Sequence, residues 1–199
     1  MGDIAESPAS GSWPGSRAES TCALKEDTME PYSLEFNAAV MTMANRVCPC
    51  GYDVSDAAHS APDSLAALNK HIETTRRILV SRDHSDNTIF SDPEINWAFR
   101  AWHDWTHWRI QAEFDLVGEV EVALRQVKDL TTVYGPAFGN RYQPIIFAEG
   151  IGHTLLKELT GKFPIDQRRF DAAFLGLFGP ALPVVQRRMC GREQHDVAA

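Results

Sequence analysis

The sequence predicts an all-α protein, a single globular bundle of about six helices that follows a disordered N-terminal tail. Six stretches combine helical spacing of apolar residues with capping or terminating residues at their ends, and no stretch shows the alternating pattern of a strand. The chain has 199 residues, of which 44% are hydrophobic and 23% are charged. This length and composition are ordinary for one soluble domain with a sizeable core, so a helical bundle is expected.

The two ends of the chain are expected to lie outside this domain. Residues 1–30 are rich in Ser, Gly, Pro, Ala and acidic residues and have no hydrophobic periodicity, so they are predicted to be disordered. Met29 is an alternative start, which would remove most of this tail. The helical domain is expected over 31–188, followed by a frayed C-terminal tail over 189–199.

The first two helices are predicted from apolar spacing and capping residues. One is expected over 32–47, and the other over 64–81, where Asp63 or Ser64 can cap it. Polar residues, Gly and Pro predict connecting loops over 48–62 and 82–90.

A third helix is predicted over 91–114, which holds four of the five tryptophans. Ser91 and Glu94 form a capping box, and no Gly or Pro follows Pro93 within this stretch, so about five or six turns are expected. The tryptophans are interpreted as core aromatics, with Trp102 to one side of a band formed by Trp97, Trp105 and Trp108.

The second half of the chain predicts three more helices. Asp115 can cap a helix over 116–134, whose apolar stripe is Val120, Ala123, Leu124, Val127 and Leu130. Two Gly and two Pro predict a loop over 135–144. Helices over 144–161 and 165–178 are expected to follow.

Histidines in the third helix predict a metal site. His103 and His107 are four residues apart, so they fall about 40° apart on one helix face, which is the spacing of two metal ligands. Asp104 lies next to this pair and could ligate or orient a ligand.

A second pair at the same spacing, Glu149 and His153, lies in the fifth predicted helix. Gly150 and Gly152 flank these residues, and each costs about 1 kcal/mol of helix stability relative to Ala, so close approach of another group would explain them. We therefore predict one metal centre with a divalent zinc, manganese or iron ion, held by His103, His107, Glu149 and His153. Glu113 and Glu119 could complete its shell, although such carboxylates are commonly plain surface groups.

The His103-Asp104 dipeptide, with His71 on an earlier helix and Asp166 on a later one, resembles the HD-type metal phosphohydrolases. That resemblance implies a metal set made of these four residues and a nucleotide substrate. The segment from Phe99 to His107 and the stretch 149–170 also resemble a family of uncharacterised bacteriophage and bacterial proteins, which implies no activity.

The function expected from these residues is that of a metal-dependent hydrolase acting on a nucleotide or another phosphorylated small molecule. Asp104 would orient a metal-bound water, and Arg100 would meet the anionic substrate. Two alternatives stay open: a non-haem iron oxidoreductase, and a non-enzymatic helical phage or accessory protein with a structural metal or none.

The net charge and the hydropathy of the sequence limit the kinds of partner and the cellular location that are expected. The formal net charge of -8 disfavours nucleic-acid binding, which needs an excess of Lys and Arg. The sequence has no apolar run of about eighteen residues and no secretory signal pattern, so neither a membrane span nor export is expected. A cytoplasmic protein with a small-molecule substrate is therefore predicted.

Overall fold

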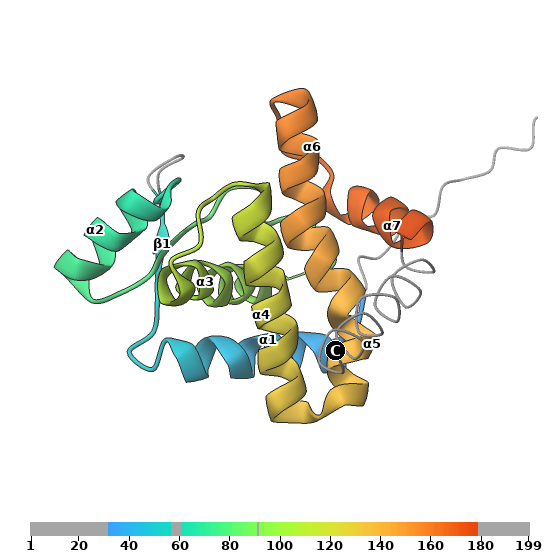
Figure 1. Ribbon diagram of the computed structural model, residues 1–199, viewed down its shortest axis with the longest axis horizontal. Coiled ribbons are helices and arrows are strands. Elements are labelled where there is room, and N and C mark those ends of the chain that lie inside the picture. Colours follow the sequence, from blue (N-terminus) through green and yellow to red (C-terminus); the bar gives the residue numbers. More distant parts are fainter. Residues whose placement is uncertain (1–31, 57–60, 91, 179–199) are drawn as a thin grey trace, which may run out of the picture.

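The computed structural model describes residues 32–56, 61–90 and 92–178, and these form six helical rods and one small sheet (Figure 1). The elements, in chain order, are α1 (Leu34–Val47), β1 (Asp53–Ser55), α2 (Leu65–Thr75), β2 (Leu79–Ser81), α3 (Pro93–Ile110), α4 (Leu116–Tyr134), α5 (Pro136–Phe147), the π-helical turn η1 (Ala148–Gly152), α6 (His153–Thr160) and α7 (Gln167–Phe178). Because α5, η1 and α6 follow one another without a break, they count as one rod, and the predicted all-α fold is confirmed. The predicted tails, 1–30 and 189–199, lie outside the described residues.

Side-chain caps begin five of these helices. In each case a side-chain oxygen accepts a hydrogen bond from a backbone N–H in the first turn, which otherwise would have no partner. The capping residues are Ser33, Ser64, Asp92, Asp115 and Asp166. At the start of α3, the carboxylate of Asp92 accepts from the Glu94 N–H at 2.8 Å, and Ser91 of the predicted capping box lies outside the described residues.

A two-stranded parallel sheet replaces the end of the second predicted helix. The structure ends α2 at Thr75, because Arg76 adopts the left-handed conformation with φ of 61°. The next apolar residues then form β2, which pairs with β1 in the register Val54↔Val80. Ile78 and Val80 are buried, and such β-branched residues pack well in an extended backbone.

The segment 135–144 is helical, although its glycines and prolines predicted a loop. Pro136 occupies the first turn of α5, where its missing N–H would have no partner. Gly139 faces α4, and a Cβ there would lie 2.1 Å from Thr131 Oγ1, so only glycine lets the two helices pack this closely. Packing against α4 thus outweighs the weak helix propensity of this segment.

Helix α3 lies between two hydrophobic clusters. The larger cluster joins α3 to α1, α4 and α5 and contains Phe36, Phe90, Phe99, Trp102, Tyr142, Ile145 and Ile146. The smaller cluster joins α3 to α2 and the strands and contains Leu68, Ile72, Ile78, Val80 and Ala101. Figure 1 shows α2 and the strands on one side of the molecule and α7 on the other, with α4 beside the α5–η1–α6 rod.

The burial of the tryptophans differs from the predicted one. Trp102 is fully buried in the larger cluster, whereas Trp97, Trp105 and Trp108 are only partly buried against the smaller one. The reason is that α2 and the short strands cover the second face of α3 incompletely, while α1, α4 and α5 enclose Trp102. Among the described residues, no helix is both long and apolar enough to cross a membrane.

We expect Trp102→Ala to lower the free energy of unfolding by about 3–5 kcal/mol, because it leaves a cavity in the larger cluster. Trp108→Ala is the matched control on the same helix, and its loss should be smaller because its ring is already partly in water. Urea unfolding of both variants measures the difference, and equal losses would contradict this ranking of the two positions.

Candidate metal centre

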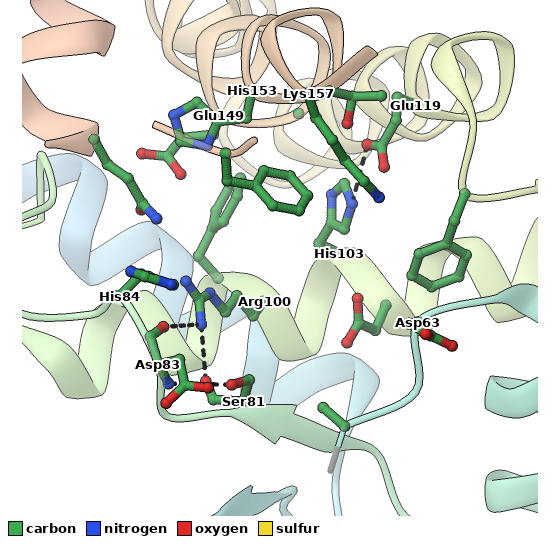
Figure 2. A pocket seen from close by; sticks show the side chains of 18 of the residues that line it. Asp63, Ser81, Asp83, His84, Arg100, His103, Glu119, Glu149, His153 and Lys157 are labelled. Carbon is green, nitrogen blue, oxygen red and sulfur yellow. Dashed lines mark hydrogen bonds and ion pairs between the residues drawn. The ribbon is translucent and has the colours of Figure 1, made fainter. Parts of the chain in front are cut away.

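A cavity of about 420 Å³ opens beside α3 and is lined by residues of α3, α4, η1, α6 and α7, of β2, and of four loops (Figure 2). Its walls combine imidazoles, carboxylates and cationic groups with the rings of Phe99, Phe114 and Phe163. The polar residues that line it are Asp63, Ser81, Asp83, His84, Arg100, His103, Asp104, Glu119, Glu149, His153, Thr154, Lys157 and Gln167.

Three of the buried polar groups form what we call the first triad: His103, His107 and Glu119. The Nε2 atoms of the two imidazoles are 3.0 Å apart. One oxygen of Glu119 lies 3.2 Å from Nε2 of His103, and the other lies 3.5 Å from Nε2 of His107. His107 and Glu119 are buried and His103 is nearly so, so these three groups meet with little water between them.

Hydrogen bonds on the far side of each ring orient both imidazoles of the first triad. The chain turns back after α3 because Gln111 adopts a φ of 56°, and this brings the carbonyl of Ala112 to 3.0 Å from Nδ1 of His107. A carbonyl only accepts, so Nδ1 of His107 carries the hydrogen and its Nε2 presents a lone pair. Nδ1 of His103 lies 3.4 Å from Oε1 of Gln126 on α4, which orients that ring in the same way.

The ligand atoms of the first triad are spaced as they would be around one ion. Nitrogen and oxygen ligands about 2.0–2.2 Å from a metal lie about 2.8–3.6 Å from one another in tetrahedral or octahedral sites. The three distances within the triad, 3.0, 3.2 and 3.5 Å, all fall in this range. Two imidazole nitrogens this close require a proton or a cation between them.

In the metal-free protein a proton, rather than a metal ion, lies between the imidazole nitrogens of His103 and His107. Burial by itself lowers the pKa of His103, but the negative charge of Glu119 outweighs it and raises the pKa to about 9. Burial likewise raises the pKa of Glu119, and the charge of His103 reverses this and lowers it to about 2. The first triad thus holds one positive and one negative charge that attract each other.

A second triad lies on the other side of Gly150: Glu149, His153 and Asp171. Nε2 of His153 lies 2.9 Å from Oδ1 of Asp171, and all three residues are at least nine-tenths buried. Burial, followed by the charge of Asp171, raises the pKa of Glu149 to about 8, and burial raises that of Asp171 to about 7. Among the described residues, the two triads are the groups of at least three potential ligands whose donor atoms lie within 4.8 Å of one another.

The four residues predicted to share one metal are therefore divided between two triads. His103 and His107 are together, as are Glu149 and His153, but each pair is completed by a carboxylate from another helix instead of by the other pair. The triads are close neighbours, since a Cβ on Gly150 would lie 3.3 Å from Oε2 of Glu119.

The metal set implied by the HD-type phosphohydrolases is not assembled. Neither His71 nor Asp166 lines the cavity. His71 lies on α2, and the exposed Asp166 caps α7 by accepting from the Arg169 N–H at 2.9 Å. His103 and Asp104 do line the cavity, so only half of that set lies there.

Asp104 and Arg100 lie in the cavity wall without belonging to a triad. Burial raises the pKa of the Asp104 carboxyl to about 6. Nη1 of Arg100 donates to the carbonyls of Ser81 and Asp83 at 2.8 and 2.7 Å, which fixes the guanidinium from the side of β2 (Figure 2). Within the described part of the chain Arg100 forms no ion pair, so its remaining donors are free for a ligand.

Sequence reasoning underrated Glu119 and missed Asp171. Glu119 and Gln126 lie on the buried face of α4 with Val122 and Ala123, whereas Leu124 of the predicted stripe is 51% exposed. Two polar residues seven positions apart, inside a helical stripe, are the signal that identifies them. Asp171 lies next to Phe170 on α7, and one acidic residue beside an aromatic one carries no comparable signal.

We expect the metal-free protein to lose stability as the pH rises from about 6.5 to about 9. The pKa of His103 is 6.5 in an unfolded chain and about 9 in the folded one, so its proton stabilises the fold fully below pH 6.5. That contribution is lost as the pH rises through 9. Thermal unfolding of chelator-treated protein across this range measures the loss.

Glu119→Gln is the control, because it removes the charge that holds the proton on His103. The decline above pH 6.5 should become smaller in this variant. Glu149 and Asp171 add a decline of the same sign up to about pH 8, which both proteins share. Equal declines in the two proteins would show that His103 does not hold this proton.

Comparisons of the chain with protein-family models, curated proteins and solved structures find no significant match, so its chemistry is interpreted from the two triads and the cavity they line.

Proposed function

We propose that this protein is a metal-dependent hydrolase whose divalent ion is held by His103, His107 and Glu119. The supporting observation is the pair of Nε2 atoms, 3.0 Å apart, beside a buried carboxylate in the wall of a cavity. Two imidazoles and one carboxylate are a donor set that binds zinc, iron and manganese. Because His103 and Glu119 line the cavity, the site suits a catalytic ion better than a structural one, which would be enclosed by four protein ligands.

A divalent ion with three protein ligands keeps a position for water, lowers the pKa of that water and polarises a substrate oxygen. The protein has to supply a proton acceptor and a binding site for the substrate. Asp104 is the acceptor that the geometry favours, because it lines the cavity one residue after His103 and takes no part in either triad.

The charged groups of the cavity favour an anionic substrate. Arg100 forms no direct ion pair among the described residues, and Lys157 extends into the same cavity from α6 (Figure 2). A fixed guanidinium together with an ammonium group suits the oxygens of a phosphoryl group. We therefore propose a phosphorylated small molecule, such as a nucleotide, as the substrate.

A non-haem iron oxidoreductase is the second candidate function. Two histidines and one carboxylate are also the ligand set of mononuclear iron enzymes that keep open positions for oxygen and substrate. The first triad has this composition, so metal identity and oxygen consumption separate the two candidates.

Metal analysis and phosphatase assays of protein purified without a histidine tag test the proposal. We expect bound zinc or manganese and hydrolysis of p-nitrophenyl phosphate or a nucleotide. His107→Gln should abolish activity and remove the ion from the first triad, while Asp104→Asn should keep the ion and lower kcat by about 10²–10⁴-fold.

His71→Gln is the matched control, because it removes a histidine outside the cavity and should change neither metal content nor rate. Iron with oxygen-dependent turnover would favour the oxidoreductase. A protein without metal, unchanged in stability by chelators, would favour a non-enzymatic helical protein.

A further inference from the structure

The second triad has the composition of a metal site of its own. Glu149 comes from η1, His153 from the first turn of α6 and Asp171 from α7, so three helical segments bring their polar groups to one point. Their exposed fractions are 9%, 7% and 0%. Two carboxylates and one imidazole with so little water around them need a partner of opposite charge.

The two carboxyl groups of this triad lack some of the hydrogen-bond donors that buried oxygens normally have. Oε1 of Glu149 and Oδ2 of Asp171 are buried and have no hydrogen-bond donor among the described residues. Asp171 contacts His153 and the carboxyl group of Glu149, and no Lys or Arg forms an ion pair with either carboxylate within the described part. Buried carboxylate oxygens normally have donors, so two such oxygens without one require either a proton shared by the carboxyl pair or a bound cation.

We propose that Glu149, His153 and Asp171 bind a second divalent metal ion, so that the cavity holds a two-metal centre. The 2.9 Å separation of His153 Nε2 and Asp171 Oδ1 is also the separation of two ligands of one ion. The inference concerns metal binding and holds whichever reaction the cavity carries out.

The fold brings this second site close to the first one at Gly150. A Cβ on this residue would lie 3.3 Å from Oε2 of Glu119 and 3.6 Å from Cε1 of His103. A larger side chain would therefore separate the two triads, and glycine lets η1 approach α3 and α4. Two ions in one cavity can stabilise both the attacking and the leaving oxygen of a displacement at phosphorus.

A second glycine and the π-helical turn hold the third ligand in place. A Cβ on Gly152 would lie 3.1 Å from Phe174 and 3.2 Å from Phe170, so glycine lets α7 pack directly on η1. That packing sets Asp171 beside His153. Single π-helical turns are frequent at functional sites, and η1 contains Glu149 and is followed directly by His153.

The donor sets predict different metal preferences for the two sites. The first triad offers two nitrogens and one carboxylate, which suits zinc or iron. The second offers one nitrogen and two carboxylates, a harder set that suits manganese or ferrous iron. Manganese is therefore the ion with which to probe the second site.

The experiment is a count of bound ions after chelation and reconstitution with Mn²⁺, read by elemental analysis and by electron paramagnetic resonance. The full chain should bind two ions per molecule, with a spectrum broadened by coupling between neighbouring ions. Asp171→Asn keeps the shape of the side chain and should bind one ion, with an uncoupled spectrum. His107→Gln should lose the other ion, and the double variant should bind none.

His71→Gln is the control, and circular dichroism confirms that each variant is folded. One ion in the wild-type protein, lost in His107→Gln and kept in Asp171→Asn, would overturn the second site and leave the first intact. Two ions in Asp171→Asn would also overturn it. A protein that binds no ion would overturn both sites, so the two failures are distinguishable.

Discussion

The charge enclosed beside α3 is the constraint on which the rest of this structure depends. Six ionisable groups, three imidazoles and three carboxylates, lie largely away from water in the two triads. A buried ion without a partner is strongly unfavourable, so these groups need one another, a proton or a metal ion. The first triad meets this requirement with a proton on His103, and the second leaves carboxylate oxygens without donors.

The helices around the triads hold the charged side chains in fixed positions. Helix α3 is held on two sides by the hydrophobic clusters, which leaves its third side, with His103 and Asp104, facing the cavity, and His107 is buried next to His103. Because Trp102 and the aromatic residues around it are closely packed, the backbone that carries the two histidines is held by the core. The imidazoles are then oriented by groups outside the helix, the carbonyl of Ala112 and the amide of Gln126.

The π-helical turn and its glycines link the two triads into one centre. Gly150 lets Glu149 approach the first triad, and Gly152 lets α7 approach His153. Each glycine weakens the helix in which it lies by about 1 kcal/mol relative to Ala. The close approach of neighbouring side chains explains why both positions are glycine. A helix selected only for stability would not contain glycine there. Arg100, fixed by the backbone of Ser81 and Asp83, adds the cationic side of the cavity.

The sequence by itself determined the helical class, most helix boundaries and the two ligand pairs at helical spacing, because these depend on periodicity, caps and residue type within one segment. The tertiary structure decided which residues complete the pairs. Glu119 and Asp171 are adjacent to the histidines only in space, and their burial depends on how α4 and α7 pack. It also decided that 135–144 is helical and that 79–81 is a strand, since contacts with α4 and β1 outweigh local propensity there. Spacing along one helix constrains a pair of ligands, whereas the third ligand comes from another helix and follows from packing.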